Sequence, residues 1–136
     1  MLLVNAGVAK PSPKVGQALG PLGVNMMEFC KQFNEHTSHL KPSAVMRVRV
    51  TAYEDRTFTF ATLPPATTWF LKRVTGIQKG AKMPGHEKVG TISLKAIYEI
   101  AKVKQAHDPR LSILALESIT KSVASSAKTL GLELTH

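Results

Sequence analysis

The pattern of apolar and polar residues changes midway along the chain, and its first half predicts a small sheet. Residues 2–8 are mostly apolar and predict an opening strand. Over residues 45–52, apolar and polar side chains alternate, which is typical of a strand with one face in solvent. Residues 54–56 predict a turn, and Phe58 and Phe60 predict a returning strand.

A helix is predicted between the first two of these strands. Asn25 is a favourable N-cap, and Glu28 completes a pair that resembles a capping box. The apolar stripe has the spacing of a buried helix face and consists of Met26, Phe29, Cys30 and Phe33. Residues 10–23 are rich in glycine and proline, and we expect a loop there. The first half thus predicts a small N-terminal α/β domain over residues 1–63.

The second half, residues 67–136, predicts helices alone. Thr67, Ser93 and Ser112 each precede a segment of helical periodicity and are candidate N-caps. The second helix is expected to bury a face made of Leu94, Ile97, Tyr98 and Ala101. The third is expected to bury Leu116, Ile119, Val123, Ala127 and Leu130, and to end at Gly131 in the left-handed conformation. These elements predict a three-helix bundle.

Two adjacent prolines separate the halves. Pro64 and Pro65 have no amide hydrogens and a fixed φ, and each favours extended backbone in the residue before it. Residues 64–66 therefore predict a short, stiff linker. The expected fold class is α+β, with a small N-terminal α/β domain (a short sheet with a helix) joined by this Pro-Pro linker to a C-terminal three-helix bundle.

The charge of the chain points to a polyanionic partner. Its 136 residues contain 18 Lys+Arg against 9 Asp+Glu, which gives a formal charge of +9. Nucleic acid is the first candidate partner and an anionic membrane surface the second. A membrane-spanning segment is not expected, because no apolar run approaches the roughly 18 residues that one needs. The single cysteine, Cys30, excludes an internal disulfide and is expected to lie in the core.

Two basic segments of the second half are the predicted contacts with a polyanion. The first, the lysine loop (residues 76–90), places Lys79, Lys82 and Lys88 among glycines, where the backbone can approach phosphates closely. A solvated connector is the plainer alternative. The second, the basic helix (residues 121–131), presents lysines beside small hydroxyl side chains that let a helix lie close to a sugar-phosphate backbone. An ordinary solvent-facing helix is the alternative here.

Other kinds of chemistry lack support in the sequence. The glycine-rich stretch over residues 10–23 has neither the Lys-Ser/Thr pair of a phosphate-binding loop nor the spacing of a dinucleotide turn. His36 and His39 have no third ligand at a useful spacing, so no metal site is expected. No catalytic motif is recognisable, and we expect no enzyme activity, no cofactor and no small-molecule substrate. A DNA-binding regulator remains an alternative, although the third helix lacks the Asn, Gln or Arg residues that read base edges.

Several short stretches resemble the family of large-subunit ribosomal protein eleven, and they run in the family's order over nearly the whole chain. In the first half they are Pro-Ser-Pro at 11–13, Val-Gly at 15–16, Ala-Leu-Gly at 18–20, Gly-Val-Asn at 23–25, Met-Glu-Phe-Cys-Lys at 27–31, Asp-Arg at 55–56 and Phe-Thr-Phe at 58–60. In the second half they are Pro-Pro at 64–65, Gly-Ile at 76–77, Lys-Val-Gly at 88–90, Ile-Ser at 92–93 and Ala-Lys-Thr-Leu-Gly-Leu at 127–132. Phe-Leu-Lys at 70–72 and Tyr-Glu-Ile-Ala-Lys at 98–102 resemble the mitochondrial branch of that family.

The resemblance implies a structural protein at the base of the ribosomal stalk. It would bind the GTPase-associated segment of large-subunit rRNA, with stalk ribosomal proteins and, transiently, translational GTPases as further partners. The implied rRNA-binding residues are Lys72, Lys79, Gly80, Lys82, Pro84, His86, Lys88, Ser93, Lys121, Ser125, Ser126, Lys128, Thr129 and Gly131. The implied loop facing factors and the stalk contains Pro11, Ser12, Pro13, Lys14, Gly16, Gln17 and Gly20.

The chain also departs from the family pattern. Bacterial members usually have Gly-Thr-Ala-Arg-Ser where this chain has Ser-Ser-Ala-Lys-Thr at 125–129, so a point charge at Lys128 replaces a planar guanidinium. Lys14 and Gln17 stand where the family has further prolines, which bears on binding of thiazole-peptide antibiotics. The stretches that resemble the mitochondrial branch lead us to expect that the protein is located in the mitochondrial ribosome, in the matrix. The alternative location is the cytoplasm of a bacterium.

Overall fold

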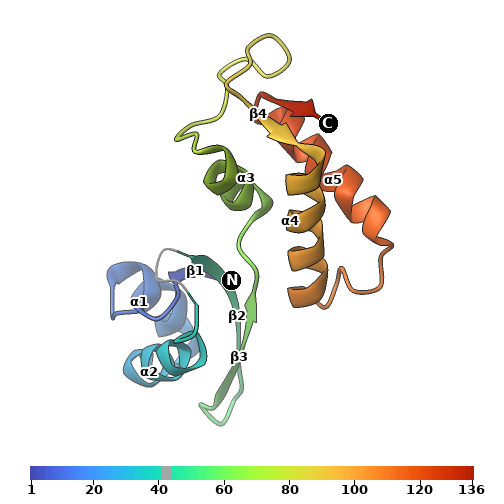
Figure 1. The fold of residues 1–136 in the computed structure, drawn as a ribbon. Coiled ribbons are helices and arrows are strands. Elements are labelled where there is room, and N and C mark those ends of the chain that lie inside the picture. The colour runs from blue at the N-terminus through green and yellow to red at the C-terminus, as the bar shows by residue number, and fades with distance from the viewer. Residues whose placement is uncertain (41–43) are drawn as a thin grey trace. The chain divides into compact units, whose positions relative to one another are not determined.

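A computed structural model describes residues 1–40 and 44–136 (Figure 1). The chain divides into two compact units, Met1–Pro65 and Ala66–His136, and each unit has its own hydrophobic core. The boundary falls within the Pro-Pro-Ala segment at 64–66. The units are described separately below.

The N-terminal unit contains the antiparallel sheet that the alternating pattern predicted. Strands β1 (Leu2–Asn5), β2 (Val45–Ala52) and β3 (Phe58–Leu63) pair in the order β1-β2-β3. The opening strand is shorter than the predicted 2–8, because Gly7 adopts a φ of +70° and its amide donates a hydrogen bond to Thr37 Oγ1 at 2.8 Å. This side-chain contact replaces a further ladder bond and ends the strand.

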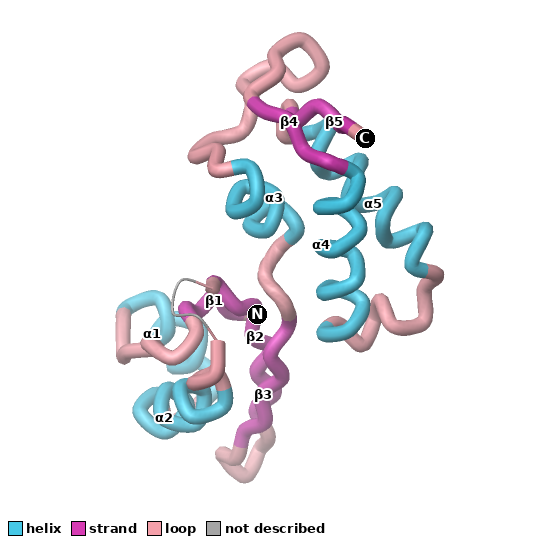
Figure 2. The backbone as a smooth tube through the Cα atoms, viewed as in Figure 1, coloured by secondary structure: helices cyan, strands magenta, loops and turns pink. Residues whose placement is uncertain are grey.

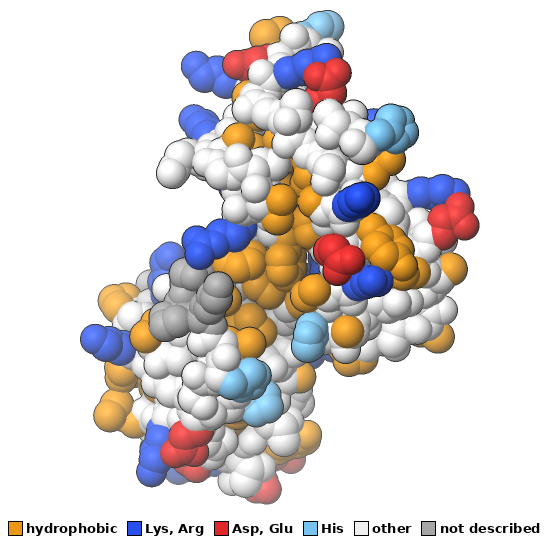
Figure 3. Space-filling view, in the orientation of Figure 1, with side chains coloured by type: hydrophobic (Ala, Val, Ile, Leu, Met, Phe, Trp, Pro, Cys, Tyr) orange, Lys and Arg blue, Asp and Glu red, His pale blue; other side chains and the backbone are white. Residues whose placement is uncertain are grey.

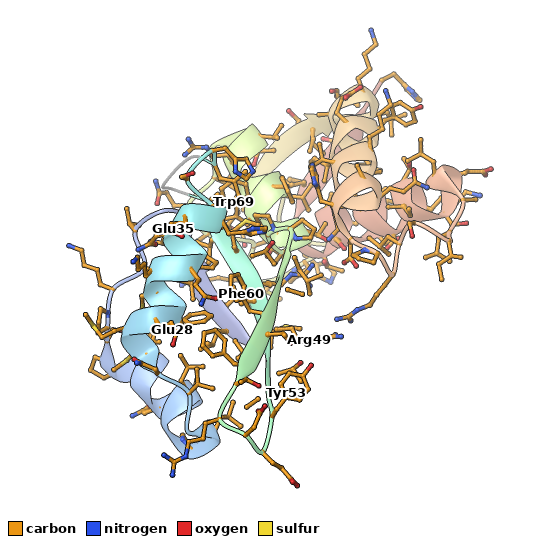
Figure 4. All side chains as sticks on the ribbon, turned by 90° about the horizontal axis from the view of Figure 1, so that it is seen from below. Glu28, Glu35, Arg49, Tyr53, Phe60 and Trp69 are labelled. Atoms are coloured by element: carbon orange, nitrogen blue, oxygen red, sulfur yellow. The ribbon has the colours of Figure 1, made fainter. Side chains whose placement is uncertain are left out.

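Helix α2 (Met26–His36) packs on this sheet through its predicted apolar stripe. Asn25 is confirmed as the N-cap, because its Oδ1 accepts hydrogen bonds from the amides of Met27 and Glu28. Phe29 is fully buried and its ring centroid lies 5.7 Å from that of Phe60 on β3. Figure 4 shows Phe60 directed toward α2, whereas Arg49 points from the sheet to solvent. Cys30 is buried in the same stripe, and burial raises the pKa of its thiol.

The expectation of an irregular loop over residues 10–23 is wrong. This stretch contains helix α1 (Pro13–Leu19) and a short 3-10 turn, η1 (Gly20–Leu22). Ser12 is the N-cap of α1 and Pro13 is its first residue, a position where a missing amide hydrogen costs no helical bond. The abundance of proline concealed a helix start that proline in fact favours.

The C-terminal unit has three α-helices, but the expectation of helices alone is wrong. Besides α3 (Thr67–Thr75), α4 (Leu94–His107) and α5 (Leu116–Thr129), it contains strands β4 (Gly90–Ser93) and β5 (Leu132–Thr135), which pair in parallel (Figure 2). Each strand has four residues, too few for an alternating pattern to stand out. Their buried side chains, Ile92 and Leu132, extend the core of the helices.

Of the three N-caps predicted in this unit, one is confirmed and two are wrong. Ser93 caps α4, since its Oγ accepts a hydrogen bond from the Ala96 amide at 3.2 Å. The predictions for Thr67 and Ser112 are wrong, because α3 and α5 begin after Ala66 and Ala115. The Thr67 hydroxyl instead accepts a hydrogen bond of 2.6 Å from Lys104 on α4, and the Ser112 hydroxyl donates to the Pro109 carbonyl. These side chains join helices and close a turn rather than cap a helix.

The buried face of α4 is also rotated from the predicted one. Ile97 and Ala101 are fully buried as expected, but Leu94 and Tyr98 are exposed and Ile100 is buried in their place. In α5 the expected face is confirmed, with Ile119, Val123 and Ala127 buried and Leu116 and Leu130 packed against them. The sequence therefore predicted the buried face of α5 correctly, although it placed the start of the helix too early.

Candidate nucleic-acid interface

The lysine loop is attached to the C-terminal end of α5, so the two predicted basic segments lie together. The Ala81 amide donates to the Leu130 carbonyl at 2.9 Å, and the Val89 amide donates to the Gly131 carbonyl at 2.9 Å. The loop then continues into β4, which pairs with β5 directly after α5 (Figure 2). Because backbone hydrogen bonds fasten both ends of residues 81–89 to the helix terminus, this loop has a defined position on the unit.

Gly131 makes this close approach possible. Its φ of +84° is the left-handed conformation predicted for the end of the helix. A Cβ atom at this position would lie 2.5 Å from the Ala81 Cβ and 3.0 Å from the Glu87 carbonyl oxygen. Gly80 is less restricted, because a Cβ there would lie 3.1 Å from Leu130 Cδ2, the end of a side chain that can shift. Gly131 is buried, so its contribution to the site is to let the loop and the helix meet.

The cations of the two segments differ in whether an acid already neutralises them. Lys88 Nζ lies 2.7 Å from Glu133 Oε1, and Lys121 Nζ lies 2.6 Å from Glu117 Oε1 one turn earlier on α5. In the described part of the chain, the side chains of Lys79, Lys82 and Lys128 form neither an ion pair nor a hydrogen bond. All of these lysines are exposed. The unpaired ones carry the charge available to a polyanion.

A cleft lies between the loop and the α5 terminus. It has a volume of about 470 Å³ and is lined by Gly85, Glu87, Lys88, Lys128, Gly131, Leu132, Glu133 and Leu134. The lining contains two lysines and two glutamates, so the formal charges of the cleft cancel. Figure 3 shows basic, acidic and histidine side chains close together at this end of the unit. The site therefore consists of a cleft with no net formal charge and exposed lysines around it, rather than a uniformly cationic surface.

The two carboxylates of the cleft were not singled out from the sequence. Glu87 accepts a hydrogen bond from the Lys82 amide at 3.1 Å and so stabilises the turn of the loop, and Glu133 on β5 pairs with Lys88. An acid among lysines is ordinary in a surface loop, and the partner of Lys88 lies 45 residues away in the chain. The side chains of Lys88 and Glu133 come together only because β4 pairs in parallel with β5.

Three hydroxyl groups of α5 donate hydrogen bonds within the helix. Ser125 Oγ donates to the Lys121 carbonyl, Ser126 Oγ to the Ser122 carbonyl and Thr129 Oγ1 to the Ser126 carbonyl, at 2.7–3.1 Å. Because each hydroxyl donates its proton to a carbonyl, its oxygen can still accept a hydrogen bond from an external donor. RNA supplies such donors along its backbone as 2′-hydroxyl groups. The helix thus offers acceptors for ribose beside a cation for phosphate.

The remaining predicted residues of the second half have varied positions. Pro84 and His86 are exposed near the tip of the lysine loop. Ser93 is half-buried, and its side chain is engaged as the N-cap of α4. Lys72 lies on α3 and lines a different groove, which is described below. Neither Ser93 nor Lys72 lines the cleft at the α5 terminus.

The predicted factor-facing residues lie on and beside α1 in the N-terminal unit. Pro11, Pro13, Lys14, Gln17 and Gly20 are exposed, whereas Ser12 and Gly16 are half-buried. Ser12 is held by its capping bond to Val15, and Gly16 packs near the side chain of Met26. Four of these residues lie within α1, whereas Pro11 and Ser12 precede it and Gly20 begins η1, where the apolar side chain of Leu22 is exposed.

The described residues contain no evident centre for metal chemistry. Within 1–40 and 44–136, His, Cys, Asp and Glu side chains nowhere gather in a group of three or more that could hold a metal ion. His36 instead packs edge-on against Phe60 and lies 3.4 Å from the Thr62 hydroxyl. Over the same residues, every helix is too short or too polar to cross a membrane.

Comparison with protein-family models gives two matches that follow one another along the chain. Residues 1–58 match the model described as ribosomal protein L11, N-terminal domain. Residues 63–134 match the model described as ribosomal protein L11, RNA binding domain. The second match spans more than half of the chain and contains both the lysine loop and α5.

Proposed function

Because this chain belongs to the ribosomal protein L11 family, we propose that it binds the GTPase-associated region of large-subunit rRNA at the base of the ribosomal stalk. Membership of the family gives the coarser role, that of a non-enzymatic structural protein of the large ribosomal subunit that binds rRNA. The proposal adds which segment of the rRNA is bound and which surface binds it.

The observation that carries the proposal is the attachment of the lysine loop to the α5 terminus. Its two backbone hydrogen bonds place Lys82 and Lys128 on one end of the unit, with neither cation paired to an acid within the described residues. Cations fixed on a preformed surface can contact phosphates that a folded RNA holds at matching positions. The acceptor oxygens on α5 add contacts that depend on ribose. This combination favours recognition of RNA shape over base sequence.

The N-terminal unit supports the second part of the proposal, the role at the stalk. The surface formed by α1 and η1 exposes prolines and Leu22, which are suited to contacts with protein. We infer that this surface faces translational GTPases and stalk proteins during translation. Pull-down of stalk proteins by the full chain, lost in a Leu22→Asp variant that still binds rRNA, would support this part.

The proposed location is the mitochondrial ribosome. Its support is the resemblance of residues 70–72 and 98–102 to the mitochondrial branch of the family. We expect the tagged protein to sediment with large subunits from isolated mitochondria. Sedimentation with bacterial large subunits alone would contradict the mitochondrial assignment and leave the family role in place.

The RNA-binding proposal is tested by measuring the affinity of the full chain for two nucleic acids at several salt concentrations. One is a transcript of the GTPase-associated region, and the other is duplex DNA of the same charge. We expect tight binding to the transcript with a log–log salt slope of roughly −3 to −5, which corresponds to about four to six phosphate contacts at about −0.7 to −0.9 each. Equal affinity for the duplex DNA would contradict the proposal and favour a general polyanion binder.

The Lys88–Glu133 pair predicts a variant that binds RNA more tightly. In Glu133→Gln the 2.7 Å ion pair is lost and Lys88 becomes available to a phosphate. An exposed pair contributes only about 0.2–1 kcal/mol, so we expect affinity to rise by a few-fold. Glu99→Gln is the matched control, because it releases Lys102 on α4 instead. Filter binding should show a gain for Glu133→Gln alone; equal gains would mean that overall charge decides.

A further inference from the structure

The C-terminal end of α3 carries an open groove that shares no residue with the cleft at the α5 terminus. The groove has a volume of about 430 Å³ and lies between one face of the helix and the first residues of the lysine loop. It combines an aromatic ring, two cations and an amide, and is lined by Trp69, Lys72, Arg73, Gly76, Ile77 and Gln78.

Helical spacing and a tight helix end bring these side chains together. Lys72 and Arg73 follow Trp69 by three and four residues, so the three side chains share one face of α3. Gly76 ends the helix with a φ of +74°, and its amide donates to the Lys72 carbonyl at 2.8 Å. This turn folds the chain back, so that Ile77 and Gln78 also line the groove.

The Trp69 ring is held in place by a second aromatic side chain. Its centroid lies 5.2 Å from that of Phe70, and the ring planes meet at 82°, an edge-to-face arrangement. Trp69, labelled in Figure 4, is half-buried and keeps part of its surface in solvent. An aromatic ring fixed in this way can stack a planar ligand at little further entropic cost.

The polar side chains of the groove are available to a ligand. Within the described residues, the side chains of Lys72, Arg73 and Gln78 form no ion pair or hydrogen bond. Two cations at the end of a helix are favoured by its dipole, but this does not account for an adjacent indole that keeps part of its surface in solvent. A ring for stacking, cations for phosphate and an amide for a base edge together fit a nucleotide.

We propose that the α3 groove binds one unstacked nucleotide of the rRNA, with its base on the Trp69 ring and its phosphates at Lys72 and Arg73. The inference rests on the proposed function, since the nucleotide belongs to the rRNA segment assigned above. Continuity supports an RNA occupant, because Gly76, Ile77 and Gln78 are also the start of the lysine loop. Gln78 is placed to hydrogen-bond the edge of the stacked base.

The test uses the fact that Trp69 is the single tryptophan of the chain. The full chain is titrated with the transcript of the GTPase-associated region while tryptophan emission and filter binding are recorded in parallel. Base stacking is expected to quench the emission in step with binding. Inorganic polyphosphate, which has the charge of RNA but no bases, is the control and should bind without quenching.

The possible outcomes separate this inference from the proposed function. Binding of the transcript with unchanged emission overturns the stacked nucleotide and leaves the RNA-binding role intact. Equal quenching by polyphosphate also overturns it, because charge alone would then explain the signal. If the transcript does not bind at all, the proposed function fails and the inference fails with it.

A pair of variants tests the affinity. Trp69→Leu should weaken transcript binding about tenfold, within the range for loss of one base–aromatic stack. Tyr98→Leu removes an aromatic ring that is exposed on α4 outside the groove and should leave affinity unchanged. Thermal unfolding followed by circular dichroism shows that each variant is folded. Equal effects of the two substitutions would contradict a specific role for Trp69.

Discussion

Replacing Gly131 by alanine is expected to destabilise the C-terminal unit by about 3 kcal/mol, because the new methyl group meets both strain and a clash. The residue has a φ of +84°, which alone costs a side chain about 1–2 kcal/mol. The added Cβ would also lie 2.5 Å from the Ala81 Cβ and 3.0 Å from the Glu87 carbonyl oxygen. The lysine loop must then move away from α5, so we expect RNA affinity to fall together with stability.

Gly76→Ala is the matched control. Its φ of +74° imposes the same kind of strain, but a Cβ there meets no atom within 4 Å. We expect a loss of about 1–2 kcal/mol from strain alone. Thermal unfolding followed by Trp69 emission reports on this unit, since the residue lies on α3. If both variants lose the same stability, contact between the loop and α5 does not restrict position 131.

Exchanging Lys82 and Lys128 for glutamine is expected to weaken rRNA binding about 100-fold. Neither side chain is paired with an acid in the described residues, so each is available to phosphate. A hydrogen bond to a charged group contributes about 1.5 kcal/mol or more, and the two together about 3 kcal/mol. The log–log salt slope should become shallower by roughly 1.4 to 1.8, because two fewer phosphate contacts release counterions.

The double variant Lys95→Gln with Lys102→Gln removes the same charge from α4 and is the control. It should leave the filter-binding affinity close to that of the unmodified chain. An equal loss in both double variants would mean that net charge, rather than the surface built by the loop and α5, governs binding. Loss of affinity without a change of slope would contradict phosphate contact.

The sequence was most informative where a local pattern decides the structure. The alternation over 45–52 and the apolar stripe through Phe29 and Phe33 place β2 and α2 correctly, because a strand and a helix expose their side chains with different periods. The cap at Asn25 and the glycine at 131 were likewise confirmed, since each depends on its immediate neighbours in the chain.

The sequence was least informative where distant residues decide the structure. The pairing of β4 with β5 joins Gly90 to Leu132, and no local pattern announces a parallel pair of such short strands. The same pairing brings Glu133 to Lys88 and makes the cleft nearly neutral. Net charge pointed to a polyanionic partner, but it could not show which lysines an acid already neutralises.

The central claim is that the lysine loop and the α5 terminus bind one RNA together. The most direct measurement follows backbone amide chemical shifts of the isotope-labelled full chain during titration with the transcript of the GTPase-associated region. We expect amides of residues 79–88 and 122–131 to shift along one binding curve that saturates at one RNA per chain. Shifts confined to one of these segments, or two curves with different midpoints, would contradict a shared interface.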